Sequence, residues 1–332
     1  MILSRTPFRI SFFGGGTDYP IWYRENGGAV LATSIDKYCY ISCRYLPPFF
    51  DYKHRIVYSQ VEEANEIDTI RHPAVKGVLQ WLGVTRGLEI HHDGDLPARS
   101  GLGSSSSFTV GLIHAMKALE GQLISKRDLA KAAVHVEQEV IRETVGSQDQ
   151  ILSSYGGFNK IEFDRDDTFN VTPIVVEKNR LADFQNHCML FFTGLSRFAS
   201  EIAADSLKNI KKRGKELKTI QGMVDEALSI LVSRTAPLND FGKLLHESWQ
   251  CKRRLSEKVS TAQIDQIYEA GLAAGAFGGK ILGAGGGGFI LFLVKPELQN
   301  KVREKLKKLV HVSFRFDSTG SKIVIYEPDD FR

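Results

Sequence analysis

Apolar and polar positions in the first half of the chain alternate with a period of two in some segments and with helical spacing in others. The period-two segments predict strands at 29–45, 54–60 and 88–92. Apolar residues recur at helical spacing from Phe108 to Leu119, and a second helix is expected at about 126–145. Ser125 and Asp128 form a capping box at the start of that second helix.

The second half begins with a continuous apolar run, HCMLFFTG at 187–194, which is typical of a buried strand. Charged helices are expected to follow as far as about residue 274. The remaining elements expected are a strand at 287–294, a helix at about 296–309, and a strand pair at 311–316 and 322–327. Strands that mix with helices in both halves predict an α+β fold of two lobes, which we divide into 1–175 and 176–332.

Composition narrows the class of protein. A chain of 332 residues with 42% hydrophobic and 25% charged residues is long and apolar enough for two soluble domains. The apolar stretch at the N-terminus is short and interrupted by arginines, unlike a signal peptide, so a cytoplasmic location without a membrane partner is expected. The net charge of +4 is too small to indicate nucleic acid. The four cysteines lack the spacing of a zinc site.

The segment ARSGLGSSSS at 98–107 lies where a predicted strand ends and a predicted helix begins. Unpaired N–H groups at a helix start favour an anion, and a glycine turn lets the backbone approach a polyphosphate closely. An ordinary serine cap after a glycine turn explains the same residues, and the local pattern favours the two interpretations about equally. The segment lacks the Walker pattern, so a P-loop of that kind is excluded.

Two further segments are rich in glycine. FGGGTDYP at 13–20 implies an unusual backbone or a close ligand, and its Asp18 is suited to accept hydrogen bonds from sugar hydroxyls. The alternative for this segment is a glycine turn with an Asx cap. GGKILGAGGGGFILFLV at 278–294 predicts a loop that packs tightly in front of a buried strand, although a tight helix–strand junction also uses glycine.

Two acidic residues near the second predicted helix are candidates for chemistry. Glu137 falls in the apolar stripe of that helix, so its carboxylate needs a partner, and a metal ion is one candidate. Asp149 lies at a helix end, twelve residues further along the chain. A structural salt bridge or a helix cap is the alternative for each acid taken alone.

Taken together, these segments resemble a known family. R-x-P-x-R-I-S-F-F-G-G-G-T-D at 5–18, P-x-x-x-G-L-G-S-S-S at 97–106 and K-I-L-G-A-G-G-G-G at 280–288 look like the three motifs of the GHMP kinases. The chain is similar throughout to the branch that phosphorylates D-glycero-D-manno-heptose 7-phosphate. It departs from galactokinase, which has G-E-H-T-D where this chain has Gly14 to Asp18.

The resemblance implies a ribosomal-protein-S5-domain-2-like N-terminal lobe and a ferredoxin-like C-terminal lobe. It also implies ATP and Mg²⁺, with Ser105 and Glu137 as metal ligands. The catalytic residues that it implies are Asp149, which orients or deprotonates the attacking hydroxyl, and Arg9, the basic residue near it and near the transferred phosphoryl group. The residues that it assigns to the nucleotide are Pro97, Ser100, Gly101, Leu102, Gly103, Ser104, Ser105, Ser106 and Ser107. Those that we assign to the sugar are Gly15, Gly16, Thr17, Asp18, Arg197, Gly285 and Gly286.

The implied reaction is transfer of the γ-phosphoryl group of ATP to the anomeric hydroxyl of D-glycero-D-manno-heptose 7-phosphate. The partners expected are therefore ATP and a sugar phosphate, bound by a monomer or a homodimer. Arg197 is the cation we expect at the sugar's own phosphate, because a guanidinium fork suits phosphate; the other candidates are Lys37, Arg44, Lys252 and Lys280. Two alternatives remain open: a related kinase for an unphosphorylated sugar such as fucose or galactose, and a non-catalytic sugar sensor.

Overall fold

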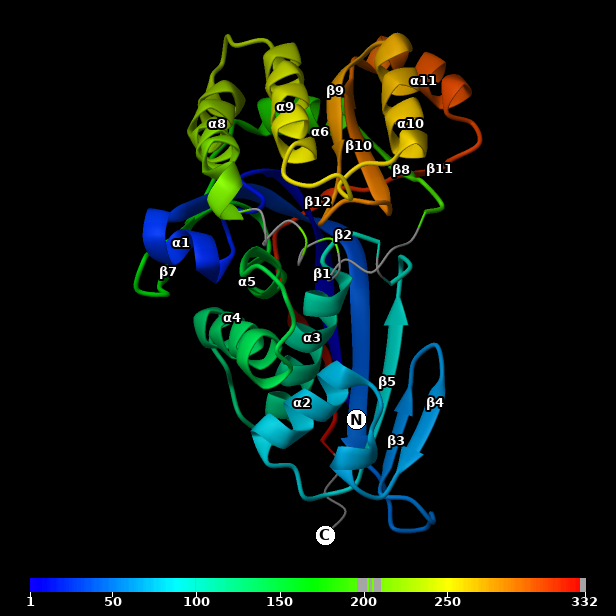
Figure 1. Cartoon of the computed structure of the whole chain (residues 1–332). Coiled ribbons are helices and arrows are strands. Elements are labelled where there is room, and N and C mark those ends of the chain that lie inside the picture. Colours follow the sequence, from blue (N-terminus) through cyan, green and yellow to red (C-terminus); the bar gives the residue numbers. More distant parts are fainter. Residues whose placement is uncertain (99, 196–201, 203–204, 206–209, 329–332) are drawn as a thin grey trace.

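The computed structural model describes residues 1–98, 100–195, 202, 205 and 210–328. Two sheets build the molecule, one of nine strands and one of four. The larger sheet occupies one end of the molecule and the smaller sheet, with its own helices, the other end (Figure 1). The N-terminus lies in the part of the larger lobe that is remote from the smaller one (Figure 1).

The larger sheet is built around two long antiparallel strands, β1 (Ile2–Phe13) and β2 (Gly28–Tyr45). β1 is almost continuously buried because it runs through the centre of the sheet. The other strands are β3 (His54–Val57), β4 (Val61–Ala64), β5 (Leu88–Gly94), β6 (Phe158–Phe163), β7 (Phe169–Pro173), β12 (Phe316–Asp317) and β13 (Lys322–Tyr326). The main order is β13-β1-β2-β5-β3-β4, and β3 runs parallel to β5.

Helices of the first half cover this sheet and position the serine-rich segment. They are α1 (Pro20–Asn26), α2 (Pro73–Leu82), α3 (Ser104–Leu119), α4 (Lys126–His135) and α5 (Gln148–Tyr155). A single 3₁₀ turn, η1 (Ile67–Thr69), precedes α2. Helix α3 packs on β1 and β2, and nearly all of its side chains are buried. Its N-terminus therefore points toward the smaller lobe (Figure 1).

The smaller sheet has the order β11 (Val310–Val312), β8 (Cys188–Phe192), β10 (Phe289–Val294) and β9 (Ala276–Ile281), all antiparallel. Its helices are α6 (Lys178–His187), α8 (Gly214–Val232), α9 (Leu238–Arg253), α10 (Ala262–Ala273) and α11 (Gln299–Lys305), with 3₁₀ turns at Ile210–Arg213 and Pro296–Leu298. None of the helices described here combines the length and apolarity that a membrane crossing requires.

A cluster of phenylalanine rings joins the two lobes. The ring of Phe12, near the end of β1, lies 5.4 Å from that of Phe184 on α6. The ring of Phe13 lies 5.1 Å from that of Phe241 on α9, and all four side chains are fully buried. Edge-to-face and tilted contacts of this kind stabilise aromatic clusters beyond simple burial. The cluster fixes α9 against the end of β1, where the first glycine motif begins.

The α+β fold expected from the sequence is confirmed, as are the strands at 29–45, 54–60, 88–92, 187–194 and 287–294 in their main parts. The second helix is shorter than predicted: α4 ends at His135, a π-helical turn covers Val136–Val140, and Arg142 has a positive φ of 60°. A π-turn shifts the phase of the side chains by one residue, which the 3.6-residue pattern does not include.

The strand predicted at 322–327 is confirmed as β13, the segment 311–316 contains parts of β11 and β12, and the pairing predicted between the two segments is wrong. β11 pairs with β8 in the smaller sheet, whereas β12 pairs with β2 and β13 with β1 in the larger one. Each strand finds a partner from elsewhere in the chain, which local alternation does not reveal. The helix predicted at 296–309 is a 3₁₀ turn followed by the shorter α11. The division into 1–175 and 176–332 stays a prediction, with residues 316–326 returning to the larger sheet.

Candidate active site

A cavity of about 1110 Å³ is lined by residues of both halves of the chain. The end of β1, the first glycine motif, the start of α3 and the loop before α5 form one side of it. Helix α9 and the third glycine motif contribute Lys252, Lys280, Gly283 and Ala284 from the other side. The cavity thus brings together all of the segments that the sequence singled out for chemistry.

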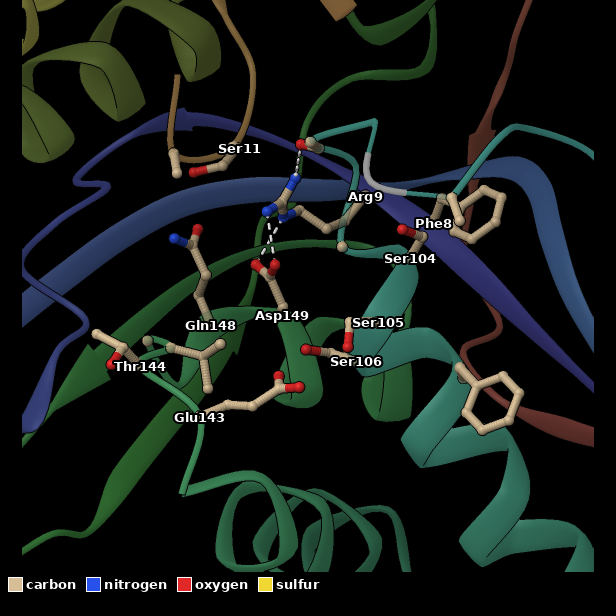
Figure 2. A pocket seen from close by; sticks show the side chains of 18 of the residues that line it. Phe8, Arg9, Ser11, Ser104, Ser105, Ser106, Glu143, Thr144, Gln148 and Asp149 are labelled. Carbon is tan, nitrogen blue, oxygen red and sulfur yellow. Dashed lines mark hydrogen bonds and ion pairs between the residues drawn. The ribbon is translucent and has the colours of Figure 1, made fainter. Parts of the chain in front are cut away.

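Arg9 and Asp149 form a two-pronged ion pair in this cavity (Figure 2). Arg9 Nε donates to Asp149 Oδ1 at 2.7 Å, and Nη2 donates to Oδ2 at 2.6 Å. The third nitrogen, Nη1, donates to the carbonyl of Gly101 at 2.6 Å. The arginine side chain is 4% exposed and the aspartate side chain 22% exposed, so the carboxylate faces the cavity with its orientation held by the arginine.

The serine-rich loop places a helix start beside this pair. Gly103 is the N-cap of α3, and a Cβ there would lie 3.3 Å from Asp149 Oδ2. Ser104, Ser105 and Ser106 follow in the first turn and line the cavity. The N–H groups at a helix start and the helix dipole make the site suitable for an anion next to Asp149.

The four serines differ in where their side chains lie. Ser105 is exposed, whereas the buried Ser106 donates to Glu137 Oε2 at 2.9 Å. Ser107 is fully buried: its hydroxyl donates to the Pro7 carbonyl at 3.0 Å and its N–H donates to Gly103. Ser107 therefore holds α3 against β1, unlike the nucleotide contact expected of it.

Glu137 is fully buried on the π-helical turn, behind Ser106. Its Oε2 accepts hydrogen bonds from Ser106 and from the Gln150 amide, while Oε1 has no hydrogen-bond partner among the described residues. Burial raises the pKa of Glu137 to about 7. A buried carboxylate with an unpaired oxygen fits a divalent cation, which would favour its charged form.

The part of the chain that the structure describes contains no group of three or more His, Cys, Asp or Glu residues arranged as a metal site. Mg²⁺ does not need one, because it keeps water and substrate phosphate oxygens as ligands beside one or two carboxylates. Glu143 also lines the cavity, and its carboxylate points toward Ser105 and Ser106 (Figure 2). Glu143 was not among the residues predicted for the site.

The first glycine motif forms the opposite wall around a buried acid. Asp18 is 1% exposed, accepts from the backbone N–H of Gly16 at 2.9 Å and accepts from the Gln148 amide at 3.0 Å. Burial, and then the charge of Asp149, raise the pKa of Asp18. Gly15 and Gly16 also line the cavity. Thr17 is fully buried and donates to the carbonyls of Gly14 and Ala29, so it supports the turn from behind.

Two polar atoms near Asp18 have unused hydrogen-bonding capacity. Ser11 Oγ and Gln148 Oε1 are both buried, and neither has a partner among the residues described. Both residues line the cavity. Their neighbour Lys280 is 4% exposed and donates to the Phe12 carbonyl at 2.8 Å. A ligand rich in hydroxyl groups would satisfy these atoms, because each hydroxyl both donates and accepts.

The third glycine motif joins the two lobes at the serine-rich loop. Gly283 has a φ of +72°, and a Cβ there would lie 2.6 Å from the Cα of Gly101. Lys252, on α9, donates to the Gly283 carbonyl. Burial and the charge of Arg9 lower the pKa of Lys252 to about 8. Gly285 and Gly286 pack against Val259 instead of lining the cavity.

Aromatic and imidazole rings form another part of the cavity lining. The ring centroid of His72 lies 4.6 Å from that of Phe108 in a stacked arrangement, and the His92 ring meets Phe108 edge-on at 5.1 Å. Tyr58 contacts His72 edge-on at 4.8 Å. Burial lowers the pKa of both histidines, so they are neutral at pH 7. The sequence did not reveal this wall, because its rings come from four separate segments: the turn after β3, the start of α2, strand β5 and helix α3.

The structure therefore brings together most of the predicted site. The predicted residues that line the cavity are Arg9, Gly15, Gly16, Asp18, Gly101, Gly103, Ser104, Ser105, Ser106 and Asp149. Those described but not among the lining residues are Thr17, Pro97, Ser100, Leu102, Ser107, Glu137, Gly285 and Gly286. Arg197 lies outside the described residues.

Two family patterns match the chain: GHMP kinases N terminal domain at residues 69–157 and GHMP kinases C terminal at 234–312. The chain belongs to the GHMP kinases. Members of this family use ATP as phosphate donor, generally with Mg²⁺. As a member of this family, the protein is an ATP-dependent phosphotransferase with an alcohol group as acceptor, as the resemblance implied.

Two curated relatives and one solved structure show the range of similar proteins. The chain is 27% identical to the D-glycero-alpha-D-manno-heptose 7-phosphate kinase of Campylobacter jejuni, over 92% of this chain and 93% of that one. It is 26% identical to the galactokinase of Pyrococcus furiosus, over 99% and 98%. The crystal structure of a D-glycero-D-manno-heptose 1-phosphate kinase from Bacteroides thetaiotaomicron shares the fold, with a TM-score of 0.80 at 22% identity over 98% and 100% of the two chains.

Proposed function

We propose that this GHMP kinase transfers the γ-phosphoryl group of ATP to the anomeric hydroxyl of D-glycero-D-manno-heptose 7-phosphate, giving the 1,7-bisphosphate. The observation that carries the proposal is the Arg9–Asp149 pair, held between a helix start suited to phosphate and a pocket with unused polar atoms. The name of the similar kinase from Campylobacter jejuni supports a heptose phosphate as acceptor.

In the proposed reaction, Asp149 accepts the proton of the attacking hydroxyl. The hydroxyl oxygen forms a bond to the γ-phosphorus while the bond from that phosphorus to the bridging oxygen breaks, and ADP leaves with the electron pair. Arg9 orients the carboxylate of Asp149 and supplies positive charge beside the moving phosphoryl group. Phosphoryl transfer depends mainly on such positioning and electrostatics.

The sugar would occupy the pocket around Asp18. Asp18, Ser11 Oγ and Gln148 Oε1 offer hydrogen bonds to neighbouring hydroxyls. Gly15 leaves room for a chain longer than that of a hexose, because the nearest atom to its Cβ position is Ser11 Oγ at 3.9 Å. The sugar's own phosphate needs a cation, and Arg197 remains our prediction for that contact. Of the other candidates named, Lys252 and Lys280 line the cavity, whereas Arg44 forms an ion pair with Glu89.

The nucleotide would extend from the start of α3 toward the aromatic wall. Backbone N–H groups of Ser104 to Ser106 are placed for the phosphates, and the neutral rings of His72 and Phe108 are placed for a flat base. Mg²⁺ would be held by Glu137 together with Ser105 or Ser106, and it would offset negative charge on the phosphates. Ser106 and Gln150 orient the Glu137 carboxylate for this role.

The test is ADP release with Mg²⁺ and ATP across a panel of phosphorylated and unphosphorylated heptoses and hexoses, followed by phosphorus NMR of the product. We expect the highest kcat/KM with heptose 7-phosphate and a new phosphoester at C1. A preference for fucose or galactose would show that the acceptor is an unphosphorylated sugar. A product phosphorylated at another carbon would show that the reacting hydroxyl is not the anomeric one. Binding of sugar without turnover of any member of the panel would favour the non-catalytic sensor.

A further inference from the structure

Lys252 is a half-buried cation that the proposed transfer step does not yet use. Its side chain reaches from α9 of the smaller lobe into the cavity that holds Arg9 and Asp149. Among the residues the structure describes, its hydrogen bond goes to the Gly283 carbonyl, and no carboxylate lies within ion-pair distance. An ammonium group has three N–H donors, so a half-buried lysine that faces the cavity and has one neutral acceptor has capacity for an anion.

The surroundings of Lys252 place this capacity at the transfer centre. Gly283, which accepts from Lys252, contacts Gly101, and the Gly101 carbonyl accepts from Arg9 Nη1 at 2.6 Å. Arg9 in turn holds both oxygens of Asp149. This continuous series of contacts ties the ammonium group to the carboxylate that faces the attacking hydroxyl. Lys252, Arg9, Asp18 and Asp149 all line this same cavity.

We propose that Lys252 is a catalytic cation that contacts the γ-phosphoryl group during transfer, opposite Arg9. The inference rests on the proposed kinase reaction and adds a residue from the smaller lobe to it. As the phosphoryl group passes from the bridging oxygen of ADP to the sugar oxygen, negative charge stays on its peripheral oxygens. Cations fixed on both sides stabilise that charge without reorganisation. The sugar's own phosphate, at the far end of the carbon chain, is the competing ligand for Lys252.

The experiment compares Lys252→Met with wild type in steady-state kinetics with ATP and heptose 7-phosphate. Loss of one such electrostatic contact lowers kcat by about a hundred- to a thousand-fold in known cases, so we expect a fall of that order with each KM changed little. Lys252→Arg should recover part of the loss. Lys243→Met is the matched control, because Lys243 lies on the same helix, is 62% exposed and pairs with Asp240. This control should keep wild-type kinetics.

A second measurement tests contact with the moving group directly. MgADP with aluminium fluoride and the sugar imitates the transferring phosphoryl group, and Lys252→Met should weaken binding of this mixture by about the factor lost in kcat. Its affinity for MgADP alone should stay unchanged. If the methionine variant does not fold, Lys252→Gln, whose amide can still donate to Gly283, is measured against the same expectations.

Three outcomes would overturn the inference. Unchanged kcat with a tenfold higher KM for the sugar phosphate would assign Lys252 to the acceptor's own phosphate. A higher KM for ATP alone would assign it to nucleotide binding before transfer. Wild-type kinetics in the variant would leave it without a role in the reaction. A wild-type protein inactive on every sugar contradicts the proposed function itself, which separates that failure from failure of the inference.

Discussion

The hydroxyl of Ser106 donates a 2.9 Å hydrogen bond to Glu137 Oε2 in the buried layer behind the start of α3. Its neighbour Ser105 is exposed at the cavity surface. The two adjacent hydroxyls therefore have different surroundings, and only one of them is coupled to the buried carboxylate. That difference makes their roles toward Mg²⁺ separable by mutation.

Ser106→Ala is expected to raise the Mg²⁺ concentration needed for half-maximal activity about tenfold. The variant removes a hydrogen bond to a buried carboxylate, and such bonds contribute about 1.5–3 kcal/mol. The measurement is ADP release as a function of free Mg²⁺. Ser107→Ala is the control, because it also removes a buried hydroxyl that supports the fold. If Ser105→Ala raises the Mg²⁺ requirement and Ser106→Ala does not, the exposed serine is the ligand.

Asp149→Asn is expected to lower kcat by about a hundred- to ten-thousand-fold, the usual range for loss of a general base. The amide keeps the shape of the side chain but accepts no proton at neutral pH. ATP affinity, measured by calorimetry, should change little. Asp167→Asn is the control. Asp167 Oδ1 lies 2.7 Å from Arg24 Nε in an exposed ion pair, and neither residue lines the cavity. Near-normal turnover of Asp149→Asn would remove this residue from proton transfer.

Glu137 should make the metal-free protein less stable as the pH rises from about 4.5 to about 7. Its pKa is raised from 4.5 to about 7, so within this window the unfolded state loses a proton that the folded state keeps. Below pH 4.5 both states are protonated and no stability is lost. Above pH 7 the loss is complete, at about 3 kcal/mol, since each pKa unit corresponds to about 1.4 kcal/mol.

Urea unfolding of wild type and Glu137→Gln across pH 4 to 8 measures this effect, because the glutamine does not ionise. The free-energy difference between the two proteins should change over the window and stay level on either side. Glu120→Gln, at the end of α3, is the exposed control. A difference that does not vary with pH would show that Glu137 titrates near its ordinary pKa.

The sequence predicted the site better than the details of the fold. Arg9 lies in the second half of β1 and Asp149 in the first turn of α5, and both belong to segments that the sequence singled out. His72, His92 and Phe108 could not be predicted as one wall, because their contact depends on how the start of α2, strand β5 and helix α3 pack together. Tertiary contacts of this kind leave no local pattern in the sequence.

The dependence on tertiary packing also explains the errors in the predicted secondary structure. The helix expected at 126–145 ends in a π-helical turn that contains Glu137. A pattern of 3.6 residues per turn does not predict the extra residue in such a turn. β13 leaves the smaller lobe to pair with β1, although its alternation matched that of its neighbour in sequence. Ser105 and Ser106 are the same residue type, so only the orientation of α3 in the structure shows which hydroxyl contacts Glu137.

Phe108→Leu is expected to raise KM for ATP about two- to tenfold without changing KM for the sugar. An aromatic contact of this kind contributes about 0.5–1.5 kcal/mol beyond burial, and the stacked His72 ring loses its partner. Steady-state kinetics with each substrate varied in turn provide the measurement. Phe50→Leu, an exposed ring that stacks on Tyr52, is the control. A change in the sugar KM instead would place the acceptor at this end of the cavity.

Gly283→Ala tests whether contact between the two lobes is needed for activity. A Cβ at this position would lie 2.6 Å from Gly101 Cα, so the loops must separate, and the carbonyl that Lys252 contacts moves with them.

Gly83→Ala is the matched control. Gly83 has a similar φ of +65° with nothing within 4 Å of its Cβ position, so this variant introduces the backbone strain without a steric clash. Both variants should lose about 1 kcal/mol or more of unfolding free energy, measured by urea titration. Only Gly283→Ala should also lose turnover, by tenfold or more, because Arg9 and Lys252 both depend on this junction. Equal kinetics in the two variants would show that the junction contributes to folding but not to phosphoryl transfer.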